Sequence, residues 1–268
     1  MKKEYSFKSK ILRKIVIGIA VYGAAYLVSL IALSSFVSLF RYGKDSISMI
    51  ATLIAGFAAF LTVTADEKPL LLFDSSAVFS KKPYLIVLFI LFVIFTSYSL
   101  TVSFNFLYSK IPWQVLGDKY VVQDNESLYA IPLLVRIIAY VIIGPFAEEV
   151  LFRGVVFFRF KKILPVWASV LAASIFFGLY HGNLMQGTYA FFMGSVMCLV
   201  MHYGGSFFYP LIFHIVANLI SNLCFESAHI NNVVYSTPSI IASIAYIVVA
   251  IIISYVFKGK LTKKDKKC

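Results

Sequence analysis

AEEVLFRG, residues 147–154, places two adjacent acids and an arginine inside a long apolar segment that runs from 131 to 158. A charged side chain in a hydrocarbon layer costs about 2.5–3.5 kcal/mol even on lenient insertion scales, so these charges need partners, water or a chemical task. On an α-helix Glu149 and Arg153 have the four-residue spacing of an acid-first ion pair. Glu148 points about 100° away around the same helix. We therefore predict that Arg153 neutralises Glu149 and that Glu148 is available for chemistry.

The composition of the 268-residue chain is that of a membrane protein. Hydrophobic residues make up 60% of it and charged residues only 13%, whereas soluble domains carry about 25% charged residues. Apolar runs of spanning length predict an all-α, polytopic membrane helix bundle with about eight transmembrane helices. The predicted spans are 15–40, 47–65, 84–107, 131–158, 165–181, 188–203, 207–224 and 238–257.

The distribution of Lys and Arg predicts the orientation. With the amino terminus inside, 18 of the 24 basic residues fall on inside segments, as the positive-inside rule requires. Both termini are therefore predicted to be cytoplasmic. The net charge of +12 is then explained by membrane-flanking positions, which indicates contact with membrane lipids and no nucleic-acid partner. The short loops and the lack of a targeting peptide favour a multi-pass protein of the cell membrane, specifically a bacterial plasma membrane.

Further polar residues lie in the predicted spans after Glu148. His181 ends one span, while His214 and Asn218 share one face of another at the i, i+4 spacing. A lone histidine on an apolar face is more often a satisfied core residue than a ligand, but two of them with an unpaired glutamate favour function. At 1.5 Å rise per residue all four side chains can meet near mid-membrane. Just before the acids, Gly144-Pro145 predicts a kink or a helix restart.

Three short motifs follow one another on separate predicted spans. They are Glu148-Glu149-x-x-x-Arg153, Phe177-x-x-x-His181 and His214-x-x-x-Asn218. In this order they resemble the CPBP family, the CAAX-processing and bacteriocin-processing intramembrane proteases, also called the Abi family. The resemblance covers 131–224 and leaves the first three spans outside.

The resemblance implies a role for each motif residue and hydrolysis of a peptide bond within the membrane. Glu148 looks like the catalytic glutamate of the family and His181 like its essential histidine. The remaining motif residues are the third-motif pair His214 and Asn218 and the supporting pair Glu149 and Arg153. The predicted organisation is then an N-terminal part of three helices at 1–130, a CPBP-like catalytic core at 131–224, and a last membrane helix with a basic tail at 225–268.

Two chemistries fit these residues. As the metalloprotease label of the family implies, His181, His214 and Glu148 could hold zinc with an open position for water. Without a metal, Glu148 and His181 would activate water, and His214 and Asn218 would stabilise the oxyanion. The predicted partner is a peptide or protein substrate in the membrane. The competing hypothesis is a non-catalytic membrane protein that serves bacteriocin self-immunity or scaffolds a partner.

Overall fold

The computed structural model describes residues 2–34, 43–64, 83–113, 115 and 132–264, and every regular element among them is a helix. This confirms the all-α prediction. Most of the two predicted long loops, 66–83 and 108–130, lies outside the described residues. Besides the helix that carries the acidic motif, the elements are α1 (Lys2–Ser34), α2 (Gly43–Thr64), α3 (Pro83–Tyr108), α8 (Val166–Tyr180), α9 (Leu184–Gly204), α10 (Phe208–Glu226), α11 (Ala228–Val234) and α12 (Thr237–Lys264).

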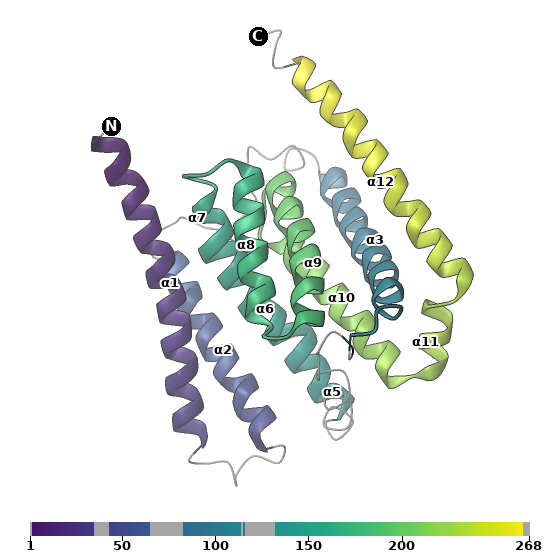
Figure 1. The fold of residues 1–268 in the computed structure, drawn as a ribbon, viewed down its shortest axis with the longest axis horizontal. Helices are drawn as coiled ribbons and strands as arrows, with labels where there is room; N and C mark the ends of the chain where they lie inside the picture. Colours follow the sequence, from purple (N-terminus) through teal and green to yellow (C-terminus); the bar gives the residue numbers. More distant parts are fainter. Residues whose placement is uncertain (1, 35–42, 65–82, 114, 116–131, 265–268) are drawn as a thin grey trace.

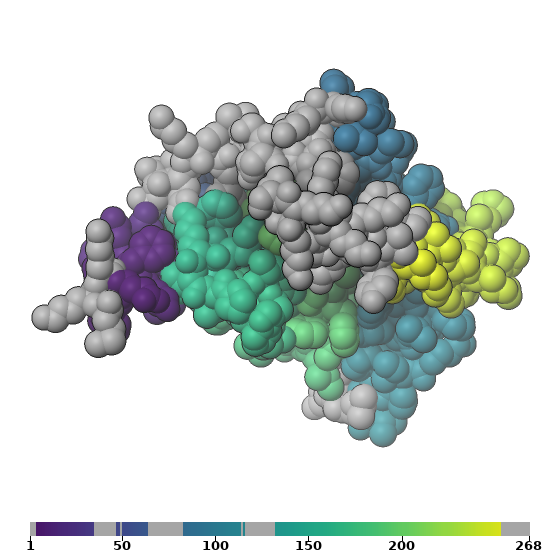
Figure 2. All heavy atoms as spheres, turned by 90° about the horizontal axis from the view of Figure 1, so that it is seen from above, coloured from purple at the N-terminus to yellow at the C-terminus, as the bar shows by residue number. Residues whose placement is uncertain are grey.

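The helices form a bundle with the motif-bearing segments inside it (Figure 1). α1 and α12 lie at opposite edges, as both views show (Figures 1 and 2). α1 packs on α2, α8 packs on α9, and α3 packs on both α10 and α12. The start of α1 and the end of α12 lie at the same end of the bundle (Figure 1). This placement agrees with termini on one side of a membrane, while the cytoplasmic side stays a prediction.

Four helical segments within the described residues are long and apolar enough to cross a membrane: Glu4–Ser34, α3, α9 and α10. A fifth is possible if Ala228–Val234 and Thr237–Ile252, bent by 48°, form one span. Ile50–Val63 and α8 are shorter apolar helices, and a 15-residue helix such as α8 reaches only about 22 Å of a hydrocarbon core of about 30 Å. The chain is a multi-pass membrane protein, and eight spans stay a prediction.

The acidic motif lies on one continuous helix that alternates between α and π geometry. Its parts are α5 (Leu133–Arg136), η2 (Ile137–Ile143), α6 (Gly144–Glu149), η3 (Val150–Phe157) and α7 (Phe158–Phe160). The residues at the junctions all keep right-handed helical φ and ψ, so the predicted restart at Gly144-Pro145 does not occur. Instead, the Gly144 N–H donates to the carbonyl of Ala139, five residues back. This wider turn precedes Pro145, whose ring would clash with a carbonyl four residues back in an α-helix.

Small residues let the outer helices approach this central helix closely. A Cβ on Gly56 of α2 would lie 2.5 Å from the Cβ of Ala147, one residue before Glu148. A Cβ on Gly18 of α1 would lie 2.5 Å from Val155. Such contacts are common where membrane helices pack through van der Waals forces. They place α1 and α2 directly against the segment that carries the acids.

Candidate active site

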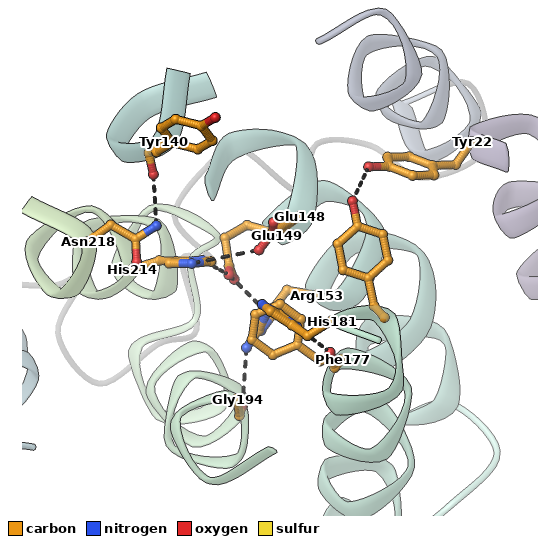
Figure 3. A network of polar contacts seen from close by, with 11 residues as sticks. Tyr22, Tyr140, Glu148, Glu149, Arg153, Phe177, His181, Gly194, His214 and Asn218 are labelled. Carbon is orange, nitrogen blue, oxygen red and sulfur yellow. Dashed lines mark hydrogen bonds and ion pairs between the residues drawn. The ribbon is translucent and has the colours of Figure 1, made fainter. Parts of the chain in front are cut away.

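Glu149 lies at the centre of a buried charge network (Figure 3). Its Oε1 atom accepts hydrogen bonds from Arg153 Nη1 at 2.9 Å and from His214 Nδ1 at 2.8 Å. Glu149 and Arg153 are both 0% exposed. The ion pair expected from the i, i+4 spacing is present although Arg153 stands in the π-helical η3. The bond to His214 links α6 to α10, a contact between distant segments that sequence spacing could not predict.

Arg153 is held by α9 as well as by Glu149. Its Nη2 donates to the carbonyl of Gly194 at 3.3 Å, and its guanidinium lies 4.5 Å from the centre of the Phe177 ring. A Cβ on Gly194 would come within 2.8 Å of Phe177 Cδ1 and 3.3 Å of Arg153 Nη2. Gly194 therefore has to be a glycine for the arginine and the ring to occupy these positions. A glycine within an apolar helix gives no sequence signal of such a role.

The Phe177 ring contacts Arg153 and both histidines. It meets His181 edge to face, with centroids 5.0 Å apart, and meets His214 in the same manner at 5.8 Å. Phe177 is 2% exposed. The ring therefore fixes the orientation of both imidazoles through packing, which explains why a phenylalanine stands one helical turn before His181.

Both histidines use Nδ1 for internal hydrogen bonds. His181 Nδ1 lies 2.9 Å from the carbonyl oxygen of Phe177, and His214 Nδ1 faces the Glu149 carboxylate. A carbonyl and a carboxylate can only accept, so each Nδ1 carries the proton. In neutral imidazoles this leaves both Nε2 atoms as acceptors. His214 Nε2 lies 3.7 Å from Glu148 Oε2.

Glu148 differs from its neighbour Glu149 in having no hydrogen bond to any described residue. Its charged contact at 3.7 Å with His214 is longer than a hydrogen bond. The Glu148 side chain is 18% exposed, against 0% for Glu149. His181 also interacts electrostatically with Glu148. The structure thus brings Glu148, His181 and His214 together from three helices.

Asn218 lies one helical turn beyond His214 but is directed elsewhere. Its Nδ2 donates to the main-chain carbonyl of Tyr140 in η2 at 2.8 Å (Figure 3). Gly144 donates to Ala139, and Pro145 has no N–H to offer the Tyr140 carbonyl. In this arrangement Asn218 joins α10 to the π-helical turn, and its amide does not face Glu148.

The comparison with protein families assigns the segment that holds this site. Residues 130–220 match the family described as type II CAAX prenyl endopeptidase Rce1-like. The predicted resemblance to the CPBP family is confirmed. The matched segment contains all the predicted site residues. Comparison with curated proteins and with solved structures gave no match.

The matched segment does not assemble a set of metal ligands among the described residues. The donor atoms of Glu148, His181 and His214 are of the kinds that zinc takes. However, no three His, Cys, Asp or Glu side chains in the described part of the chain are placed to hold a metal ion. The metalloprotease classification and the zinc site stay predictions.

Two tyrosines beside the CPBP motifs were not predicted. Tyr22 of α1 and Tyr180 of α8 share a hydrogen bond of 3.0 Å between their hydroxyls. Tyr180 directly precedes His181, while Tyr22 lies outside the matched segment. A tyrosine in an apolar first span resembles any interfacial aromatic residue, so the sequence offered no signal for Tyr22.

Proposed function

We propose that this protein is an intramembrane endopeptidase in which Glu148 activates water to hydrolyse a peptide bond. The observation that carries the proposal is the contrast between the two adjacent glutamates. Glu149 is engaged by Arg153 and His214, whereas Glu148 makes no hydrogen bond to a described residue and keeps some exposure. A general base must be within reach of the proton it takes and must have a lone pair available. Glu148 meets both conditions.

The proposed reaction has two proton transfers through Glu148. The carboxylate takes a proton from water as the water oxygen attacks the carbonyl carbon of the peptide bond, which forms a tetrahedral oxyanion. The protonated Glu148 then returns the proton to the amide nitrogen. The carbon–nitrogen bond breaks, leaving a carboxylic acid and an amine. Such positioned proton transfer contributes about 10²–10⁴-fold to the rate.

His181 and His214 assist by different routes. With Nδ1–H directed to the Phe177 carbonyl, the Nε2 of His181 can accept a hydrogen bond from the attacking water. The Nε2 of His214 lies beside Glu148, and Glu149 fixes the tautomer of His214 as the carboxylate of a catalytic triad does. Asn218 supports this arrangement by holding α10 against η2.

We favour the metal-free version of the chemistry because no three His, Cys, Asp or Glu side chains among the described residues are placed to hold a metal ion. Zinc, when bound, would lower the pKa of its water. We derive no step through it. The substrate is proposed to be a peptide or protein that reaches the site within the membrane, because the site residues stand on apolar helices. The bacterial plasma membrane is the proposed location.

The proposal is tested with purified protein in detergent. Prenylated CAAX peptides and unprenylated membrane peptides are incubated with it, and the products are identified by mass spectrometry. We expect cleavage of at least one peptide class and its loss in Glu148→Gln. Glu4→Gln is the matched control, because Glu4 is exposed and pairs with Lys8 on the surface of α1. Binding without cleavage by the wild-type protein would favour the scaffold hypothesis instead.

A further inference from the structure

The hydroxyls of Tyr22 and Tyr180 meet beside the reacting carboxylate. Their oxygens are 3.0 Å apart and their rings lie edge to face, with centroids 6.4 Å apart. Tyr180 directly precedes the site residue His181. Figure 3 shows Tyr22 reaching from α1 towards the site residues. The pair therefore lies beside the site residues that Figure 3 draws.

Packing fixes Tyr180 on the side of the site. Its ring contacts Phe152 of η3 at a centroid distance of 5.3 Å and His181 at 5.8 Å. α1 packs mainly on α2 and to a lesser extent on η3 and α7, whereas α8 packs on α9 and η3. The Tyr22–Tyr180 bond is thus a side-chain link between two helices that have little other contact.

Burial decides which tyrosine donates in this bond. Tyr22 is 6% exposed, and its one described hydrogen-bond partner is the Tyr180 oxygen. A buried O–H without an acceptor is costly, so Tyr22 donates to Tyr180. Tyr180 is 42% exposed and keeps its own O–H proton for another acceptor. Accepting a hydrogen bond also makes this hydroxyl a stronger donor.

The other potential donors of the described site are bonded elsewhere or fully buried. The N–H groups of neutral His181 and His214 are directed to Phe177 and Glu149. Arg153 is fully buried, and Asn218 donates to Tyr140. A peptide carbonyl that becomes an oxyanion needs a donor. The hydroxyl of Tyr180, a half-exposed residue, can supply one.

We propose that Tyr180, positioned by Tyr22, donates a hydrogen bond to the carbonyl oxygen of the scissile peptide bond and stabilises the oxyanion formed by water attack. The inference rests on the proposed endopeptidase function. No proton leaves Tyr180: the hydrogen bond strengthens as negative charge develops on the oxygen and weakens when the carbonyl re-forms. Tyr180 is thus assigned as a catalytic residue. Tyr22, which acts only through Tyr180, is a positioning residue supplied by a helix outside the CPBP segment.

The test compares Tyr180→Phe, Tyr22→Phe and the double variant in the peptide-cleavage assay. Removal of one oxyanion donor lowers kcat by about 10²–10³-fold. We expect this fall in Tyr180→Phe with KM within about threefold of wild type, because the bond strengthens only in the transition state. Tyr22→Phe should show a smaller fall in kcat, and the double variant should equal Tyr180→Phe.

Tyr26→Phe is the matched control, because Tyr26 stands one turn further along α1 and its hydroxyl bonds to Ser48 of α2 instead. It should retain wild-type kcat. Near-normal kcat in Tyr180→Phe would overturn the inference, as would a double variant slower than Tyr180→Phe alone. Either of these two results would leave the proposed endopeptidase function standing, provided that the wild-type protein cleaves and Glu148→Gln does not. If wild type cleaves no peptide, both proposals fall.

Discussion

The two sides of the acidic helix differ in the hydrogen bonds that their carboxylates make. On one side Glu149, Arg153 and the Nδ1 of His214 are buried and bonded to one another. On the other side Glu148 lies 3.7 Å from His214 Nε2 and makes no hydrogen bond to a described residue. Neighbouring residues of the same type thus have opposite tasks. The hydrogen-bonded, buried pair forms a fixed scaffold, and the carboxylate without a hydrogen bond is left able to react.

The largest effect on the scaffold side is expected from Arg153→Ala. It leaves Glu149 as a buried anion supported only by His214, and breaking a buried ion pair costs about 3–5 kcal/mol. We expect much lower protein abundance and a lower melting temperature in detergent. Adding Glu149→Gln should restore part of both, because it removes the uncompensated charge. Normal abundance together with lost cleavage would move Arg153 into the catalytic group.

Gly194→Ala should have the next largest effect. The added methyl would overlap Phe177 and crowd Arg153, and overpacking of this kind costs about 1–3 kcal/mol. Since Phe177 contacts both imidazoles, kcat should fall together with the melting temperature. Gly23→Ala is the control, because a Cβ at Gly23 of α1 meets no atom within 4 Å. Equal behaviour of the two variants would contradict the assigned role of Gly194.

Asn218→Ala should have a milder effect than either. It removes the hydrogen bond to the Tyr140 carbonyl, and such a bond contributes about 1 kcal/mol. We expect a small decrease in melting temperature and cleavage reduced far less than in Glu148→Gln. Asn222→Ala, which removes a similar bond to the Asn218 carbonyl, is the control. A loss of cleavage as complete as that of Glu148→Gln would return Asn218 to the oxyanion role expected from the sequence.

The smallest effect is expected from a chelator. If Glu148 works as a base without a metal, dialysis against a zinc chelator should leave cleavage unchanged, and the purified protein should contain no stoichiometric zinc by elemental analysis. Loss of activity on chelation and its return with added zinc would place His181, His214 and Glu148 in a metal site.

The sequence predicted what depends on local spacing and composition. Apolar runs located the helices, and the four-residue spacing placed Arg153 at Glu149. It could not predict contacts between distant segments, such as His214 to Glu149 or Tyr22 to Tyr180. Nor could it predict the π-helical turns, because only the packed structure shows that Gly144 donates to Ala139. The redirected Asn218 amide follows from that turn, which explains why its predicted role differs from its observed contact.

The most direct test of the central claim compares Glu148→Gln with Glu149→Gln for cleavage and peptide binding in detergent. Glutamine keeps the shape of the side chain but cannot take a proton from water. We predict that Glu148→Gln folds and binds peptide while its turnover falls by about 10²–10⁴-fold. Glu149→Gln should be less stable, because it weakens the bonds that Arg153 and His214 make to the Glu149 carboxylate. The fraction that folds should keep measurable turnover. Near-normal cleavage by Glu148→Gln with a folded but inactive Glu149→Gln would contradict the account and reverse the two assignments.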